Sequence, residues 1–320
     1  MKKNNIKGIL IVNTGSPSSL DSQSIRLYLK EFLSDKRVIH LPRLFWLPIL
    51  YLFILPFRPQ KKIKDYRKIW MKDGSPLLVL SKKLIKKLNK GIGDKGIYYR
   101  LAMRYGEPNI KDQLICFREQ KISKLIILPL FPQFSYSTTE SVIDKVQLSL
   151  KELNWELDYE IIKEYYNEHL FVSSIGNKIK NEWKENGKKD LLVFSYHGLP
   201  KKYVDKGDTY YQACCNTSEL IAKNLSLDHK DYITSFHSKF GFGEWTKPYT
   251  ENLLTDLPKK GIKSINIISP TFSIDCLETL EEIAIQFEND FIESGGNYFK
   301  YIPCLNDSDE HVKLIERLVN

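Results

Sequence analysis

The chain has 320 residues, 42% of them hydrophobic and 12% aromatic, so it is long enough for two domains and can bury a large core. The formal net charge is +9, but the lysines are spread along the whole chain and no motif of a nucleic-acid-binding module is present, so we expect no nucleic-acid partner. The five cysteines form no CxxC pair and have no regular spacing, which favours a reducing compartment over a disulfide framework or a zinc site. No apolar signal core precedes the first strand-like run, so the cytoplasm is the expected location.

Short strand-like runs alternate with longer amphipathic stretches along the chain. In the first half, strands are expected at Gly8–Asn13, Tyr98–Met103 and Leu125–Leu130, and helices at Ser24–Leu33, Leu78–Leu88 and Thr139–Leu153. In the second half, strands are expected at Leu191–Ser195, Tyr232–Phe236 and Ser264–Ser269, and helices near His169–Trp183, Thr217–Asn224, Leu277–Phe287 and Glu310–Val319. This alternation predicts an α/β fold with mostly parallel sheets that are covered by helices on both faces.

Three short matches link the two halves in the same order, always where a predicted strand ends. They pair Gly15-Ser16-Pro17 with Gly198-Leu199-Pro200, Arg104-Tyr105-Gly106 with Lys239-Phe240-Gly241, and Pro129-Leu130-Phe131 with Pro270-Thr271-Phe272. Chance is the alternative, since Gly and Pro are common after strands, but we favour duplication of one α/β unit. We expect domains at 1–165 and 166–307 that face each other across a cleft, and a last helix at 308–320 that packs back on the first domain.

The apolar stretch 41–57 stands apart from the rest of the first half. It is shorter than the roughly 20 residues of a membrane-spanning helix and is interrupted by Arg43, Pro48 and Pro56. A buried core helix is one interpretation. A basic cluster follows at once, however, which suits a segment that lies on an anionic membrane surface or lines a pocket for a flat apolar ligand. The cluster consists of Arg58, Lys61, Lys62, Lys64, Arg67 and Lys68. We therefore expect an exposed apolar lip with peripheral membrane contact.

The stretch around His197 is the first candidate for chemistry. The apolar run 191–195 reads as a buried parallel strand, and Gly198 and Pro200 then force the chain to turn. His197 should therefore lie at the carboxyl end of that strand, the edge at which open α/β sheets bind ligands. A single histidine in a loop is more often simply hydrogen-bonded by its neighbours, so this position needs a partner to indicate function.

A second stretch, from Pro270 to Ile283, leads from a strand end into a helix. Glu278 and Glu282 are four residues apart and share one helix face, where like charges repel by a few tenths of a kcal/mol. A solvated acidic face is the usual explanation. At a cleft, the same carboxylates could bind a cation or pass protons. With His197 they suit a transiently held divalent metal such as Fe²⁺, or general acid–base work. The residues alone predict a cleft enzyme that binds an apolar planar molecule.

The sequence also resembles a known family along essentially its whole length. Similar stretches in the first half are Val12–Pro17 (with Thr14 and Ser16 as departures), Tyr28–Ile39, Gly74–Leu77, Met103–Gly106 and Leu130–Ser135. Those in the second half are Ser195–Pro200, Gly207–Tyr210, Trp245–Thr250 and Asp275–Leu280. The chain resembles bacterial-type ferrochelatase, a lyase that inserts ferrous iron into protoporphyrin IX with loss of two protons in the last step of haem synthesis. The resemblance implies two Rossmann-like domains.

By the same resemblance, His197 and Glu278 are the catalytic and metal-site residues, with Glu282 as a secondary metal or proton site. A base is needed because two pyrrole N–H protons leave as the iron enters. The family is held to bend the macrocycle, at the expense of binding energy over the rest of the ring. The expected porphyrin contacts are the apolar residues 44–57, Trp245, and Arg58, Tyr66 and Ser75, the last three at places similar to those that animal enzymes use.

Two departures from the family pattern bear on function. His237-Ser238-Lys239 stands where Gln-Ser-Arg is common, and Lys cannot make the bidentate contact of Arg. The cysteines lack the tail pattern of the relatives that carry an iron–sulfur cluster, so we expect no cluster and no tightly bound cofactor, with Fe²⁺ as substrate. Cys276, where animal enzymes have a second histidine, is assigned to packing. The alternatives are a chelatase for coproporphyrin with iron or for a cobalt tetrapyrrole, or a non-catalytic porphyrin or haem carrier. A monomer is expected.

Overall fold

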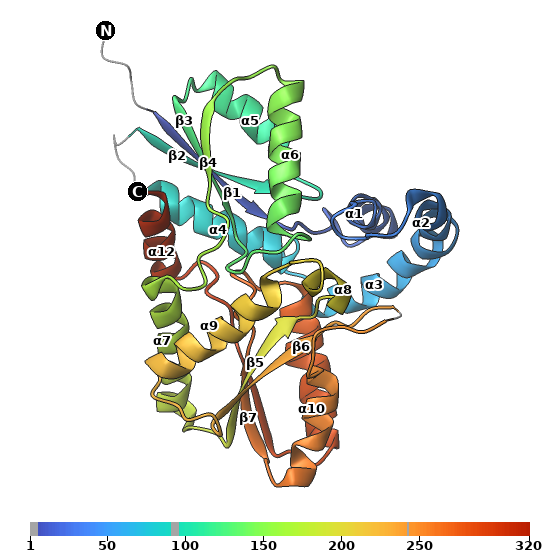
Figure 1. The fold of residues 1–320 in the computed structure, drawn as a ribbon, viewed down its shortest axis with the longest axis vertical. Coiled ribbons are helices and arrows are strands. Elements are labelled where there is room, and N and C mark those ends of the chain that lie inside the picture. Colours follow the sequence, from blue (N-terminus) through green and yellow to red (C-terminus); the bar gives the residue numbers. More distant parts are fainter. Residues whose placement is uncertain (1–5, 91–95, 242) are drawn as a thin grey trace. The chain divides into compact units, whose positions relative to one another are not determined.

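The computed structural model describes residues 6–90, 96–241 and 243–320, which form two α/β units (Figure 1). Of the described residues, the first unit contains 6–90, 96–131, 135–163 and 315–320, and the second contains 132–134, 164–241 and 243–314. Each unit is built on a four-stranded sheet, with strand order β2-β1-β3-β4 in the first and β6-β5-β7-β8 in the second. All strand pairs in both sheets are parallel, and the two orders correspond strand for strand. The predicted fold class is therefore confirmed.

The first sheet consists of β1 (Lys7–Asn13), β2 (Ile97–Met103), β3 (Lys124–Pro129) and β4 (Asp158–Ile161). Its central strand β1 is almost wholly buried, as expected for a strand that helices cover on both faces. On one face, α5 (Ile110–Glu119) and α6 (Thr139–Glu152) pack against the sheet. That core includes Leu10, Val12, Leu114, Phe117 and Val146.

The remaining helices of the first unit are α1 (Ser22–Leu33), α2 (Arg43–Ile49), the π-helix η1 (Leu50–Ile54), α3 (Leu55–Ile69) and α4 (Pro76–Lys90). The apolar segment 41–57 thus forms α2, η1 and the start of α3. The indole Nε1 of Trp46 anchors it by donating a hydrogen bond of 2.7 Å to the carbonyl oxygen of Leu33, at the end of α1. Many of its large side chains are exposed, including Leu44 (81%), Phe45 (68%) and Phe53 (65%). Trp46, Leu50 and Leu55 are buried, so the segment has one buried and one exposed side, and its service as a lip at a membrane stays a prediction.

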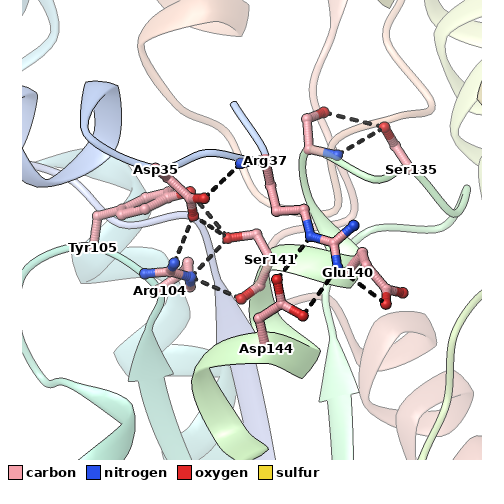
Figure 2. A network of polar contacts seen from close by, with 9 residues as sticks. Asp35, Arg37, Arg104, Tyr105, Ser135, Glu140, Ser141 and Asp144 are labelled. Carbon is pink, nitrogen blue, oxygen red and sulfur yellow. Dashed lines mark hydrogen bonds and ion pairs between the residues drawn. The ribbon is translucent and has the colours of Figure 1, made fainter. Parts of the chain in front are cut away.

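A polar network joins three segments of the first unit (Figure 2). The buried Asp35 carboxylate, just after α1, accepts hydrogen bonds from Arg104 Nη2 at 2.5 Å, Tyr105 Oη at 2.8 Å and Ser141 Oγ at 2.5 Å. Arg104 Nε in turn donates to the carbonyl oxygen of Ser141 at 2.9 Å. These contacts hold the end of α1, the end of β2 and the first turn of α6 together. The network accounts structurally for two stretches, around Asp35 and Arg104, that carry the family resemblance.

The second sheet consists of β5 (Leu191–His197), β6 (Tyr232–His237), β7 (Ser264–Ile268) and β8 (Tyr298–Ile302). Helices α7 (His169–Asn186) and α9 (Tyr210–Asn224) lie on one side of it, and α10 (Thr250–Asp256) lies on the other (Figure 1). The π-helix η3 (Glu278–Phe287) and α11 (Glu288–Glu293) share the core on the α10 side. The shorter elements are α8 (Lys201–Val204) and the 3₁₀ turn η2 (Pro258–Lys260).

The tail forms α12 (Asp309–Val319), whose last residues group with the first unit. Lys7 Nζ donates to the carbonyl oxygen of Val319 at 3.2 Å, which ties the start of β1 to the end of this helix. The six expected strands and seven expected helices are all present; most ends differ by at most three residues, but α9 begins at Tyr210, seven residues before the expected start. The elements not among those predicted are strands β4 and β8, the helices α2, η1 and α3, and the helices α5, α8, α10, η2 and α11. No helix among the described residues is long and apolar enough to cross a membrane.

Candidate active site in the second unit

His197 is the last residue of β5, as predicted, and its ring is half-buried. Its Nδ1 lies 2.8 Å from the carbonyl oxygen of Gly198. Because a carbonyl oxygen can only accept, Nδ1 must carry a hydrogen, and in the neutral ring the lone pair therefore lies on Nε2. A neutral imidazole in this tautomer can accept a proton or bind a metal ion through Nε2. The turn after β5 therefore selects the chemically useful form of His197.

Gly198 is required at this turn because the space beside it is filled. Its backbone N–H donates to the carbonyl oxygen of His237 at 2.7 Å. A Cβ at position 198 would lie 2.9 Å from that oxygen and 3.2 Å from the indole ring of Trp245. Any larger residue would have to displace backbone, which would move His197. The half-buried Trp245 thus packs against the turn that carries the histidine.

His237 lies beside His197 at the end of the neighbouring strand. The two residues are paired in the parallel register of β5 and β6, and their ring centroids are 5.8 Å apart at an interplanar angle of 63°. The His237 side chain is buried, and its Nδ1 lies 2.8 Å from Ser195 Oγ. Burial, reinforced by the nearby His197, holds the pKa of His237 well below its usual value. His237 is therefore neutral at physiological pH.

Glu282 is bound to the residue that follows His237. Ser238 donates its backbone N–H to Glu282 Oε1 at 3.0 Å and its hydroxyl to Oε2. The pKa of Glu282 is raised to about 7, mainly by burial. The negative charge of Glu278 also raises this pKa, whereas the two hydrogen bonds from Ser238 lower it. A carboxyl group with a pKa near neutrality can take up and release protons under physiological conditions.

Glu278 is the first residue of η3 and is half-buried. Its charge raises the pKa of Glu282 and, after burial as the larger cause, that of the Cys276 thiol. Cys276 is therefore a protonated, buried side chain, a poor metal ligand. A series of contacts thus leads from His197 through His237 and Ser238 to Glu282, and electrostatically on to Glu278.

A buried carboxylate fixes the segment that leads into η3. Asp275 Oδ1 accepts from Tyr301 Oη at 2.6 Å and from Thr279 Oγ1 at 3.0 Å. Asn306 pairs with Asp275 twice, because its Nδ2 donates to Oδ2 at 2.6 Å and its Oδ1 accepts from the Asp275 backbone N–H at 2.8 Å. Asn306 adopts a left-handed conformation, with φ of +52°, to do so. Strand β8 and the loop after it therefore hold the start of the helix that carries Glu278.

The predicted porphyrin contacts fall in different units. Trp245 is in the second unit, whereas Arg58, Tyr66 and Ser75 are in the first. Burial lowers the pKa of Arg58, Tyr66 is buried with its ring 5.7 Å from that of Trp70, and Ser75 Oγ is 2.5 Å from Ser16 Oγ. Their contact with a substrate stays a prediction, as do the roles of His197, Glu278 and Glu282. Within residues 6–90, 96–241 and 243–320, no three His, Cys, Asp or Glu side chains are grouped to hold a metal ion.

Sequence reasoning misses the part that His237 and Ser238 play in this site. The expected strand at 232–236 ends one residue before His237, which leaves this histidine only as a departure from the family pattern. The sequence does contain a signal for this contact, because the neighbouring strands β5 and β6 are similar in length and each ends in a histidine. Side chains of paired parallel strands point to the same face at equal register, so the two rings must meet if β5 and β6 are neighbours.

Comparisons with known proteins agree over nearly the whole chain. Residues 6–320 match the family model described as Ferrochelatase. A ferrochelatase of Vibrio atlanticus (strain LGP32) is 43% identical over 319 residues, covering 100% of this chain and 99% of the relative. A ferrochelatase of Marinomonas sp. (strain MWYL1) is 41% identical over 322 residues, covering 100% and 98%.

Solved chelatase structures share the fold at low sequence identity. SirB from Bacillus subtilis with Fe³⁺ aligns with a TM-score of 0.57 and 11% identity, covering 98% of this chain and 94% of the other. CbiX, described as the terminal enzyme for biosynthesis of sirohaem in denitrifying bacteria, aligns with a TM-score of 0.51 and 12% identity, covering 98% and 97%. These structures support the two-unit chelatase fold. By the family match and the identity over its full length, the chain belongs to the ferrochelatase family.

Proposed function

We propose that this protein is a lyase that inserts Fe²⁺ into protoporphyrin IX and releases two protons, the terminal step of haem synthesis. The family match over residues 6–320 supports the reaction class. The observation that carries the proposal within the molecule is His197, an imidazole at a strand end whose Nδ1 donates to the Gly198 carbonyl, so that the lone pair of the neutral ring lies on Nε2. Such a nitrogen is the group that the reaction needs, because it can take a pyrrole proton or hold the iron on its way in.

The carboxylates supply the charge that the imidazoles lack. A divalent ion held by an imidazole needs negative charge nearby, and Glu278 provides it at the first turn of η3. Glu282 follows on the same helix with a pKa of about 7, so it can pass on the protons that leave the ring. Ferrous iron is a substrate in this scheme, held by few ligands because it has to leave the protein with the product.

The macrocycle needs separate groups for its two propionates and its flat faces. We expect Arg58, Tyr66 and Ser75 to serve the propionates and Trp245 to contact a ring face. Burial lowers the pKa of Arg58 without removing its charge, since its ordinary value lies far above neutrality. A guanidinium in a partly desolvated position binds a carboxylate more strongly than one in open water.

Anaerobic assays of iron insertion test the function. The wild-type chain, supplied with Fe²⁺, should convert protoporphyrin IX to protohaem faster than it converts coproporphyrin, and the His197→Ala variant should lose insertion while still quenching porphyrin fluorescence. A preference for coproporphyrin, or for Co²⁺ and a reduced tetrapyrrole, would assign the protein to another chelatase reaction. Unchanged insertion by the His197→Ala variant would overturn the mechanism, and porphyrin binding without turnover by wild type would favour a carrier.

The apolar segment 41–57 suggests where the protein works. Leu44, Phe45 and Phe53 are exposed, and the exposed cations Lys61 and Lys64 follow on α3. Apolar side chains next to cations are the combination that binds the surface of an anionic membrane without crossing it. We therefore infer a cytoplasmic protein that touches the inner face of the cell membrane through this segment, where a water-insoluble porphyrin is delivered. A monomer would be sufficient for this activity.

A further inference from the structure

We propose that His237 is a second imidazole ligand for the divalent metal ion, and that Nε2 of His237 and Nε2 of His197 hold the ion together before it enters the tetrapyrrole. The inference rests on the proposed function, because it adds a ligand to the same site. It concerns the metal alone, so it can be tested without a porphyrin.

A chain of hydroxyl groups fixes the tautomer of His237. Thr250 Oγ1 donates to Ser235 Oγ at 2.9 Å, so its single hydrogen is used. Ser195 Oγ, 2.8 Å from Thr250 Oγ1, must therefore donate to that oxygen. The Ser195 hydroxyl has then no hydrogen left for His237, so it accepts from Nδ1 over their distance of 2.8 Å. His237 Nδ1 carries the hydrogen, and its Nε2 carries a lone pair.

That lone pair has no hydrogen-bond partner in the described part of the chain, although the His237 side chain is only 1% exposed. Buried polar atoms are nearly always paired, and an unpaired acceptor costs free energy, which makes this nitrogen an exception that needs an explanation. The rings nearest to His237 are His197 at 5.8 Å, Phe272 at 6.1 Å and Phe287 at 6.4 Å between centroids. Of these three, His197 alone offers a second nitrogen.

The spacing of the two rings fits a shared ion. Metal–nitrogen bonds of about 2.0–2.1 Å place the centroids of two imidazoles on one ion roughly 5–6 Å apart. The observed 5.8 Å lies within that range. Both histidines have Nδ1 as a donor to the protein and Nε2 as the available lone pair, which is the arrangement of metal-binding histidines generally.

The surroundings also suit a first-row divalent ion. Imidazole is a good ligand for Fe²⁺, Co²⁺ and Zn²⁺, whereas Mg²⁺ and Ca²⁺ prefer oxygen. Ser238, next to His237, holds the Glu282 carboxyl group, so carboxyl oxygens, a further ligand class, are one residue away from the imidazole. An ordinary edge-to-face contact between the rings would explain the distance, but it would leave the His237 lone pair unpaired.

Co²⁺ binding to the full chain, observed by proton NMR, tests the inference. Each histidine that binds Co²⁺ through Nε2 keeps its Nδ1–H, whose signal is strongly shifted by the paramagnetic ion and disappears in D₂O. We expect two such exchangeable signals in wild type and one in the His237→Asn variant, whose amide replaces the Nδ1–H donor to Ser195. Co²⁺ affinity should fall at least about tenfold, since changes beyond the direct ligands already cost that much.

The surface histidine His229 provides the matched control, because its His229→Asn variant should keep both signals and the wild-type affinity. A single shifted signal in wild type would overturn the inference. This outcome does not depend on whether the variants fold, because it is measured on the wild-type chain. Unchanged affinity in His237→Asn would do the same. Iron insertion measured on the same preparations separates the two proposals. One signal with normal insertion overturns the histidine pair alone, whereas two signals without insertion into any porphyrin support the pair and overturn the proposed function.

Discussion

Ser238 holds Glu282 with two donors, its backbone N–H at 3.0 Å and its hydroxyl, from a left-handed backbone conformation with φ of +60°. That conformation is uncommon for a residue other than glycine, and such strain persists only where the surrounding structure enforces it. Here it directs both donors of one residue at one carboxyl group. The loop after β6 therefore sets the proton affinity of a carboxyl group on η3.

Replacing Ser238 by alanine should shift the pH dependence of iron insertion. The hydroxyl hydrogen bond lowers the pKa of Glu282, so its loss should raise that pKa further above 7. If ionised Glu282 accepts the departing protons, the rising limb of the pH–rate profile should move to higher pH by the same amount. A Ser238→Thr variant keeps the hydroxyl and should restore the wild-type limb, and an unmoved limb in Ser238→Ala would exclude Glu282 from proton transfer.

The Glu282→Gln variant should be more stable than wild type at alkaline pH. Because the folded pKa, about 7, exceeds the usual 4.5, the folded state binds more protons between these values, and the free energy of unfolding falls as pH rises through them. Glutamine removes this cost and loses one Ser238 hydrogen bond, for a net gain of about 2 kcal/mol at pH 8. Urea unfolding at pH 8 and pH 5 measures the difference, which should largely vanish at the lower pH.

Adding a methyl group at Gly198 should damage activity more than stability. The new Cβ would meet the His237 carbonyl oxygen at 2.9 Å, so the turn must shift and carry His197 with it. A displacement of about 1 Å can cost roughly 100-fold in rate, while overpacking costs about 1–3 kcal/mol. Gly261 gives the control, because its φ is +89° and a Cβ added there would meet nothing within 4 Å. Gly261→Ala should lose a little stability and keep full insertion activity.

Removing the charge of Asp35 should destabilise the first unit strongly. The Asp35→Asn variant would leave Arg104, which is largely buried, without its ion-pair partner at 2.5 Å, at a cost of about 3 kcal/mol. Asp144→Asn is the matched control, since its pair with Arg37 at 2.7 Å has side chains that are 47% and 34% exposed and should contribute less than about 1 kcal/mol. Equal losses in urea unfolding would contradict the assignment of Asp35 as the centre of the network in Figure 2.

Membrane contact should depend on the exposed face of the apolar segment 41–57. Serine at Leu44, Phe45 and Phe53 together should abolish sedimentation with vesicles that contain phosphatidylglycerol. Binding to these vesicles should weaken with added salt, and pure phosphatidylcholine vesicles should bind less. Leu148, half exposed on α6, provides a control, because Leu148→Ser should sediment like wild type. If the triple variant sediments with the vesicles as wild type does, the apolar segment 41–57 does not mediate membrane contact.

The sequence predicts the elements whose signal is local. Strands β1 and β5 are recognisable because helices cover both of their faces and their residues form continuous apolar runs. Strand β4 is short and alternates between exposed and half-buried residues, so it gives no such run. Helix α5 is absent from the predicted elements although Ile110, Leu114 and Phe117 repeat at helical spacing after the N-cap Asn109.

The candidate site is predictable only in part for a similar reason. The turn after His197 and the helix start at Glu278 follow from residues next to them in the chain. The contact between His197 and His237 depends on which strands are neighbours in the sheet. The hydrogen bonds from Ser238 to Glu282 depend on a left-handed backbone conformation that serine does not favour. The π-helical form of η3 is likewise not indicated by any signal in residues 278–287.

The pairing of Asn306 with Asp275 has a consequence for how the molecule is made. During synthesis the chain emerges from its amino-terminal end, and domains fold as their last required segment becomes available. Asn306 holds the start of the helix that carries Glu278 and is synthesised after it, so this helix start is not fully held until the Asn306 amide has left the ribosome. A nascent chain, or one that terminates before Asn306, is therefore expected to lack a formed acidic site and not to bind iron there.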